Sequence, residues 1–261
     1  MFPDLFSIGP LTIHTYGLFM AAGFFLGIIV TLQLAEVEGI GPHHVVDMGF
    51  VMILSAVIGS RLLHILLNIA YYISDPAAVF KIWEGGLIFS GGILAVIPAM
   101  LWYSKRHNFS LLKIGDLWSP GVAAGQAVGR FGCFMAGCCY GKPTTLKWGV
   151  VFTHPNSLAP THIPLHPTQI YSSLSGFIIF FILLAIGAKK KYAGQVFIWF
   201  LILHSMARLL IERFRGDYRG IILNTGMTVT QLITIFILIG AVVALVFYKP
   251  QKTVNPSKSD P

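Results

Sequence analysis

Seven long apolar runs are the feature of this sequence that most limits the folds open to it. They cover residues 15–34, 45–72, 86–104, 116–136, 168–187, 195–213 and 226–248. A helix needs about 20 mostly apolar residues to cross a hydrocarbon core about 30 Å thick, and each run has about that length. A helix also satisfies its own backbone hydrogen bonds, which lipid cannot do. We therefore predict an all-α polytopic membrane protein with about seven transmembrane helices.

The runs follow one another closely, so we expect a single transmembrane domain over residues 1–248 and a short polar cytoplasmic tail over 249–261. The domain includes a polar outer loop at 137–167, which contains five prolines and three histidines. A long ordered loop of this kind usually covers or shapes a site. The first residues, Met-Phe-Pro-Asp-Leu-Phe, lack the basic region and cleavage site of a signal peptide, so we expect the first run to remain as a helix.

The composition excludes several classes of function. Hydrophobic residues make up 55% of the chain and charged residues 11%, whereas a soluble domain has about 25% charged residues. An ordinary cytosolic enzyme, a disordered tail and a DNA-binding module are therefore excluded. The formal net charge of +8 belongs to a largely apolar chain, in which positive charge serves topology and contact with anionic lipid headgroups. We expect no nucleic-acid partner.

The distribution of Lys and Arg among the connecting segments orients the bundle. With the N-terminus outside, the nine residues on the inner side are Lys105, Arg106, Lys113, Lys189, Lys190, Lys191, Lys249, Lys252 and Lys258. The six on the outer side are Lys81, Lys142, Lys147, Arg213, Arg215 and Arg219. Because cytoplasmic loops carry the excess of positive charge, we predict an N-out, C-in topology. The last three outer arginines are the exception: either the topology differs there, or they act at the outer surface.

Three arginines lie inside the predicted spans, namely Arg61, Arg130 and Arg208. An arginine at a helix centre costs roughly 2.5–3.5 kcal/mol, so each should be paired, near an interface or facing a wet cavity. At about 1.5 Å of rise per residue, all three fall in the outer half of the membrane, where Tyr16 and Ser90 also lie. Structural pairing or snorkelling is the alternative for each arginine taken alone. Their common depth favours an outer pocket that binds an anion such as phosphate.

A polar stripe surrounds one of these arginines. His204, Arg208 and Glu212 are spaced four residues apart, so they share one face of a helix. Glu212 either neutralises Arg208 or leaves it to hold a phosphate beside His204, which would accept a proton; both can be true at once. His166 and Gln169 open the fifth run, although a loop histidine on its own is more often structural.

All three cysteines, Cys133, Cys138 and Cys139, fall at the outer end of the fourth run. Adjacent cysteines cannot easily form a mutual disulfide or chelate one metal tetrahedrally, so we expect no metal site. Oxidation of Cys133 with one of the other two is an alternative. The interpretation we favour is small apolar packing beside glycine.

A longer motif contains these cysteines. Residues 129–141 read Gly-Arg-Phe-Gly-Cys-Phe-Met-Ala-Gly-Cys-Cys-Tyr-Gly. They resemble the signature of bacterial prolipoprotein diacylglyceryl transferases, G-R-x-G-N-F-x-N-x-E-x-x-G. Further segments resemble that family's motifs in the same order and spacing. These are Tyr16-Gly17-Leu18, Gly59-Ser60-Arg61, residues 85–92, residues 166–171, and the Arg-x-x-x-Glu-x-x-Arg pattern of Arg208, Glu212 and Arg215.

Several positions differ from the family pattern. They are Cys133, Ala136 and Cys138 in place of Asn, Asn and Glu, Ser90 in place of a common His, His204 in place of a Tyr, and Ser172 in place of a Glu. These differences remove polar groups that are often assigned roles in the family's site. The two central arginines, Arg130 and Arg208, are present.

The resemblance implies a bacterial inner-membrane enzyme with an active site facing the periplasm. Such an enzyme transfers the diacylglyceryl group of phosphatidylglycerol to the lipobox cysteine in the signal peptide of a prolipoprotein, which is the first step of lipoprotein maturation. The reaction alkylates sulfur and releases glycerol phosphate. We expect no metal and no cofactor, because cationic donors suffice to hold the leaving phosphate. We also expect a monomer.

The catalytic roles then fall to five residues. Arg130 and Arg208 would hold the phosphate, Tyr16 would orient a headgroup oxygen, and His204 would accept the proton in place of the histidine missing at position 90. Ser90 could instead position a water molecule or the thiol itself. The candidate substrate-binding residues are Arg61, Glu212, Arg215, Gly129, Gly132, Gly91, Gly92, His166 and Gln169.

Three other functions are compatible with parts of this pattern. A divergent family member could bind lipid or prolipoprotein without transferase activity, since the Asn and Glu positions differ. Phe89-Ser90-Gly91 suggests an intramembrane serine protease, although such sites have Gly two residues before the Ser, where this chain has Ile88. A transporter also places polar residues inside a bundle, but here they lie on one side, and no inverted repeat is evident.

Overall fold

The structure is a computed structural model that describes residues 2–8, 11–81, 85–217 and 227–247. Four of the basic residues used for topology, Arg219, Lys249, Lys252 and Lys258, lie outside the described residues. The polar tail predicted over 249–261 lies outside them as well.

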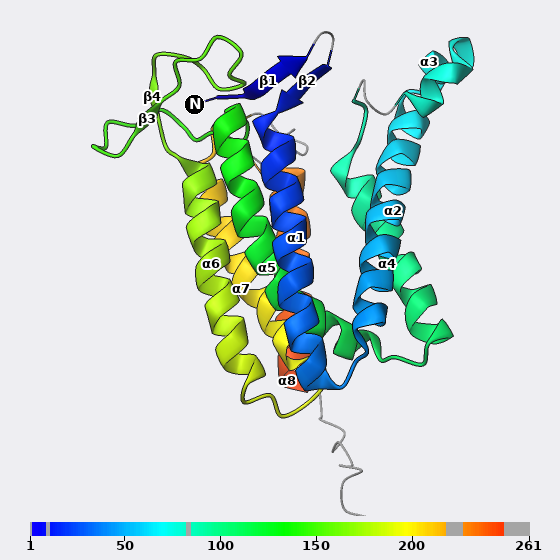
Figure 1. Cartoon of the computed structure of the whole chain (residues 1–261). Helices are drawn as coiled ribbons and strands as arrows, with labels where there is room; N and C mark the ends of the chain where they lie inside the picture. The colour runs from blue at the N-terminus through cyan, green and yellow to red at the C-terminus, as the bar shows by residue number, and fades with distance from the viewer. Residues whose placement is uncertain (1, 9–10, 82–84, 218–226, 248–261) are drawn as a thin grey trace, which may run out of the picture. The chain divides into compact units, whose positions relative to one another are not determined.

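Long helices make up most of the described chain (Figure 1). The helices are α1 (Thr15–Glu38), α2 (Pro42–Leu67), α3 (Ile69–Ser74), α4 (Phe89–Arg106), α5 (Leu111–Ala136), α6 (Thr168–Gly187), α7 (Gln195–Glu212) and α8 (Val229–Phe247), with a 3₁₀ helix η1 (Pro76–Phe80) between α3 and α4. The strands are β1 (Asp4–Ile8), β2 (Leu11–His14), β3 (Val150–Val151) and β4 (Pro164–Leu165). The run predicted over 45–72 ends early because Asn68, with φ −126° and ψ 37°, is not helical.

Five helices in the described part of the chain are long and apolar enough to cross a membrane. They cover Thr15–Val37, Pro42–Leu67, Thr168–Gly187, Gln195–Glu212 and Val229–Phe247. The spans predicted over 86–104 and 116–136 do form helices, α4 and α5, but neither belongs to this apolar group. Both contain glycines and an internal proline, and α5 also carries Lys113, Asp116 and Arg130. Helical membrane architecture is thus confirmed, and the count of seven spans stays a prediction.

The chain forms two compact units. One unit comprises residues 1–31 and 115–261, and the other comprises residues 32–114. The first contains most of α1 and of α5, helices α6–α8 and strands β1–β4. The second contains the end of α1, α2, α3, η1, α4 and the start of α5.

In the first unit, glycines bring α1 and α5 into backbone contact. A Cβ added at Gly125 would lie 2.5 Å from the carbonyl oxygen of Gly23, and one added at Gly121 would lie 2.5 Å from that of Gly27. Small residues spaced four apart allow two membrane helices to approach closely in this way. The contact continues to Gly132, where an added Cβ would lie 3.1 Å from the carbonyl oxygen of Tyr16. The start of α1 therefore lies beside the end of α5.

Helices α5, α6 and α7 share a core, and Figure 1 shows them running side by side. Its buried members are Ala123, Ile179, Leu183 and Val196. Polar contacts set the register of this core. Ser173 Oγ donates to the Ala127 carbonyl (2.8 Å), and the buried Asp116 accepts from the backbone N–H groups of Gly194 (2.7 Å) and Phe197 (2.9 Å) at the start of α7. The backbone N–H groups at the start of α7, which have no acceptor within their own helix, thus donate to the Asp116 carboxylate on α5.

The loop predicted over 137–167 is ordered, and it contains structure that the sequence patterns did not predict. Strands β3 and β4 pair in antiparallel fashion over a small core of Phe152, Ala159 and Leu165. At the N-terminus, β1 and β2 form a hairpin. Asp4 in this hairpin accepts from Asn156 Nδ2 (3.0 Å) in the loop. The hairpin and the loop therefore form one cap on the end of the unit where α5 ends.

Candidate functional site

A pocket between α5, α6 and α7 contains two of the predicted arginines. We call it the arginine pocket. Its lining residues are Gln126, Arg130, Ser172, Ser175, Gly176, Ile179, His204, Ala207, Arg208 and Ile211. Arg130, His204 and Arg208, which the sequence motifs assigned to catalysis, thus share one pocket. They come from α5 and α7, whose register is set by the hydrogen bonds of Asp116.

His204 is oriented by a residue that the sequence patterns did not single out. Its Nε2 hydrogen-bonds to Gln126 Oε1 at 2.9 Å. Because an amide oxygen only accepts, Nε2 is the protonated nitrogen and Nδ1 keeps a lone pair that can accept a proton. Gln126 lies four residues before Arg130, so the two share a face of α5. That spacing was the available signal, but a glutamine in an apolar run has no motif attached to it.

Arg208 has a carboxylate partner one turn along α7. Its Nη2 lies 2.8 Å from Glu212 Oε2, and the Glu212 side chain is buried. Thr228 Oγ1 donates to the other carboxylate oxygen at 3.2 Å. Two guanidinium groups and one carboxylate leave the described part of the pocket with one net positive charge. A pocket of that charge in a low-dielectric setting favours an anionic ligand.

A second, larger hollow lies under the hairpin, and we call it the hairpin hollow. Its volume is about 530 Å³. It is lined by Pro3, Asp4, His14, Tyr16, Ala136, Cys138, Asn156 and Leu158. Tyr16 is 41% exposed at the start of α1, so its side chain is accessible from this hollow rather than packed in the helix core.

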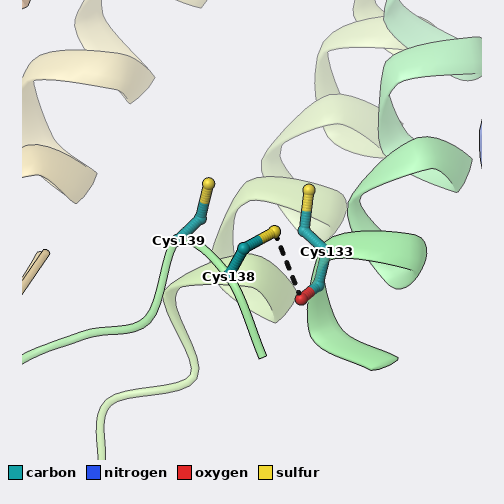
Figure 2. Close-up of side chains that lie close together, drawn as sticks. All are labelled: Cys133, Cys138 and Cys139. Atoms are coloured by element: carbon teal, nitrogen blue, oxygen red, sulfur yellow. Dashed lines mark hydrogen bonds between the residues drawn. The ribbon is translucent and has the colours of Figure 1, made fainter. Parts of the chain in front are cut away.

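The three cysteines form one cluster at the end of α5, which we call the thiol cluster. Their Sγ atoms all lie within 4.8 Å of one another. Figure 2 shows the Cys138 thiol turned toward Cys133, whose carbonyl oxygen it contacts at 3.7 Å. A left-handed backbone at Cys139, with φ 59°, allows the adjacent cysteines to reach the same point. The three thiols thus lie together, although two of them belong to adjacent residues.

The thiol cluster contacts an arginine of the arginine pocket. Arg130 Nη1 donates to Cys139 Sγ at 3.8 Å. Hydrogen bonds from the Cys133 and Cys138 thiols, together with the nearby Arg215 guanidinium, lower the pKa of the Cys139 thiol. Arg215 is itself buried, and its Nε and Nη2 donate to the two carboxylate oxygens of Asp217 at 2.8 and 2.7 Å.

Other predicted site residues hold the backbone around the cluster. The buried Gln169 donates to the Cys138 carbonyl at 2.8 Å. His166 pairs through its backbone with residues 141 and 142, and its ring lies 5.1 Å from that of Phe214. Gly129 and Gly132 face α1, where an added Cβ would meet Met20 Sδ at 3.1 Å or Phe19 Cβ at 3.0 Å. These four residues shape the site through packing and backbone contacts.

The remaining candidates belong to the unit formed by residues 32–114. Arg61 is buried there, and all three of its guanidinium nitrogens donate to backbone carbonyl groups. The acceptors are Ala78, Val79, Lys81, Gly85 and Gly86. Contacts of this kind favour a structural role, in which Arg61 holds η1 and the turn before α4.

Ser90 and the two glycines that follow it begin α4. Ser90 is exposed. A Cβ at Gly91 would lie 2.6 Å from Leu63 Cβ, and one at Gly92 would lie 2.8 Å from Ser60 Oγ. Gly91 and Gly92 therefore serve the close packing of α4 on α2.

Comparison with known proteins places these observations in a family. A family model described as prolipoprotein diacylglyceryl transferase matches residues 3–247. The phosphatidylglycerol–prolipoprotein diacylglyceryl transferase of Clostridium tetani is 38% identical over 240 residues, which cover 92% of this chain and 94% of the relative. A protein named phosphatidylglycerol–prolipoprotein diacylglyceryl transferase 2 in Clostridium perfringens is 32% identical over 90% of this chain and 91% of its own length. A similarly named protein of Finegoldia magna is 32% identical over 94% and 95%.

Proposed function

The chain belongs to the prolipoprotein diacylglyceryl transferase family, and on that basis we propose that it transfers the diacylglyceryl group of phosphatidylglycerol to the lipobox cysteine of prolipoproteins. The reaction forms a bond between the cysteine sulfur and a glyceryl carbon. The bond between that carbon and a phosphate oxygen breaks, and glycerol phosphate leaves with the electron pair.

The observation that carries this proposal is the presence of Arg130 and Arg208 in one pocket with His204. Negative charge grows on the leaving phosphate as the carbon–oxygen bond breaks, and positioned guanidinium groups stabilise that charge. His204, with Nε2 engaged by Gln126, offers Nδ1 as the acceptor for the thiol proton. Tyr16 in the hairpin hollow would orient a headgroup oxygen.

The finer features of the protein are part of the same proposal. We propose seven transmembrane helices in an N-out, C-in topology, with α4 and α5 as the two less apolar spans. The cap formed by the hairpin and residues 137–167 would then face the periplasm, and the protein would lie in the inner membrane. We also propose that it acts as a monomer and forms a single transmembrane domain over residues 1–248, followed by a short cytoplasmic tail.

An in vitro transfer assay tests the reaction. The full chain, purified in detergent, is incubated with phosphatidylglycerol labelled in its acyl chains and a peptide that contains a lipobox. We expect the peptide to gain the mass of one diacylglyceryl group, and a matched peptide with Ser in place of the lipobox Cys to gain nothing. A folded chain that binds lipid or peptide in this assay yet forms no product would contradict the proposal and indicate a binding protein.

A further inference from the structure

The thiol cluster has the dimensions of a metal site. The Sγ atoms of Cys133, Cys138 and Cys139 all lie within 4.8 Å of one another. Three sulfur atoms at the corners of a zinc tetrahedron, with Zn–S distances of about 2.3 Å, are about 3.8 Å apart. Side-chain rotations that move the sulfur atoms by about 1 Å would bring the three thiols to that spacing.

The backbone beneath the cluster is held in place. Gln169 Nε2 donates to the Cys138 carbonyl at 2.8 Å, and Thr168 Oγ1 donates to the Cys139 carbonyl at 2.7 Å. Both donor residues are buried at the start of α6. The turn that carries the adjacent cysteines is therefore fixed opposite Cys133 on α5, so the three ligands are positioned before an ion binds.

The charges around the cluster suit a divalent cation with three thiolates. Such a centre has a net charge of −1, and thiolate ligands favour soft or borderline cations such as Zn²⁺. Arg130 Nη1 lies 3.8 Å from Cys139 Sγ and supplies the compensating positive charge. Arg215 is paired with Asp217 at 2.7 Å, so that pair adds no net charge.

The position of the cluster indicates what a bound ion could do. Cys138 lines the hairpin hollow beside Tyr16, whereas Arg130, in contact with Cys139, lines the arginine pocket. The cluster thus connects the proposed phosphate site with an open hollow. A zinc ion with three protein ligands keeps a fourth position for water or substrate, and a thiol that coordinates zinc is deprotonated.

We propose that Cys133, Cys138 and Cys139 bind one Zn²⁺ as thiolates and that its fourth position, on the hairpin hollow, takes the thiolate of the substrate cysteine. The second part rests on the proposed function. Three protons pass from the protein thiols to solvent as zinc binds, and the proton of the substrate thiol passes to His204. The zinc-bound sulfur then forms its bond to the glyceryl carbon while the carbon–phosphate oxygen bond breaks, and the phosphate leaves with the electron pair beside Arg130. No oxidation state changes.

Metal content measured on the full chain tests the site without reference to activity. The chain is purified under reducing conditions, incubated with Zn²⁺ and freed of excess ion, and the zinc is measured by mass spectrometry. We expect about one zinc per wild-type chain and close to none in the variant with Cys133→Ser, Cys138→Ser and Cys139→Ser. Tyr140→Phe, in the same turn, is the matched control and should bind as wild type does. Thermal unfolding of all three proteins checks that each is folded.

Replacement of zinc by Co²⁺ tests the fourth position. We expect the wild type to show the near-ultraviolet absorption band of cobalt–thiolate bonds. The absorbance of this band should increase by about one third when the lipobox peptide is added, because a fourth thiolate joins the three of the protein. The Ser-substituted peptide should cause no increase.

Absence of zinc from the reduced, folded wild-type chain overturns the site, as does equal zinc in the triple Ser variant. An unchanged cobalt band with the Cys peptide overturns the substrate role. Normal transfer by a zinc-free wild-type chain overturns the substrate role but leaves the proposed function intact. A zinc-loaded chain that transfers nothing contradicts the proposed function and the substrate role that rests on it, but leaves the zinc site intact.

Discussion

Individual arginines in this chain differ in their partners, and the partners decide the role open to each side chain. Arg61 is engaged by backbone carbonyl groups, Arg208 by the buried carboxylate of Glu212, and Arg130 by the thiol of Cys139. Depth along a helix could place all three in one half of the membrane. Depth alone could not distinguish the roles of the three arginines, because the Arg61 acceptors and the Cys139 thiol lie on other segments of the chain.

Loss of either pocket arginine should abolish most of the transfer. We expect Arg130→Ala and Arg208→Ala each to lower kcat by about 10²–10³, since one positioned donor to a developing anion has an effect of that size. The rate is measured in the transfer assay, with thermal unfolding as the check on folding. Arg106→Ala removes an exposed arginine at the end of α4 and should retain the wild-type rate. Normal turnover in either pocket variant would argue against the phosphate role.

His204 should set the pH dependence of transfer. If it accepts the thiol proton, the wild-type rate falls as the pH is lowered and the imidazole becomes protonated. We expect His204→Gln to lower the rate by about 10²–10⁴, a typical effect of losing a general base, and to lack this fall. The measurement is kcat against pH for both proteins. A variant with the same pH profile as the wild type would exclude His204 as the acceptor.

At the scale of single elements, hydrophobic runs predicted the helices well, whereas contacts between elements depended on residues without a strong local pattern. Gly23 and Gly27 on α1 meet Gly121 and Gly125 on α5, and this contact brings Tyr16 beside the end of α5. The short strands escaped prediction because β3 and β4 have two residues each, too few for a periodic pattern. Their pairing comes from the fold of residues 137–167 as a whole.

The α1–α5 contact can be tested with one substitution at two positions on the same helix. A Cβ at Gly23 would meet the Gly125 carbonyl group, whereas one at Gly17 has nothing within 4 Å. We expect Gly23→Ala to lower the free energy of unfolding by about 1–3 kcal/mol through overpacking. Gly17→Ala should leave it unchanged or raise it slightly, because Ala favours the helix. Thermal unfolding in detergent compares the two, and equal midpoints would mean that the helices are not in close contact.

The cap should loosen at low pH through Asp4. Hydrogen bonds from Asn156 and His14 lower the pKa of the Asp4 carboxyl below its ordinary value of 3.8. The contribution of this contact is therefore complete above about pH 3.8 and is lost as the pH falls through the lowered value. Protection of the backbone amides in residues 2–8, measured relative to the intrinsic exchange rate at each pH, should fall across that lower range. Asp4→Asn should show weaker protection at neutral pH with little further change on acidification; identical protection in the two proteins would contradict this linkage.

For the whole molecule, membership of the family is confirmed, and so is a helical architecture with five helices in the described chain that are apolar enough to cross a membrane. The other two helices predicted as spans, α4 and α5, do not belong to this apolar group. In α5, the charged residues are Arg130 and, at the other end of the helix, Lys113 and Asp116. Charged side chains that serve a function lower the mean hydropathy of the helix that carries them. A span that contributes to a polar site is therefore the hardest to recognise by composition.

Reporter fusions test the proposed orientation. A green fluorescent protein joined after residue 261 should fluoresce, because the C-terminus is expected in the cytoplasm. Alkaline phosphatase inserted in the loop 137–167 should be active, because that enzyme matures in the periplasm. The opposite result at both positions would reverse the topology, and an inactive loop fusion with a fluorescent C-terminal fusion would change the number of spans.

The helical membrane class, the approximate bounds of the helices, the family and the two arginines of the pocket could be predicted from patterns along the chain. These properties depend on local hydrophobicity and on motifs read in order along the chain. Tertiary structure alone decided that Gln126 orients His204, that Arg61 holds backbone carbonyl groups, and that Cys133, Cys138 and Cys139 form one cluster beside Arg130. The physical reason is that hydrogen bonds and ligand clusters depend on distances between side chains, and those distances are set by the packing of helices and by the backbone angle at Cys139.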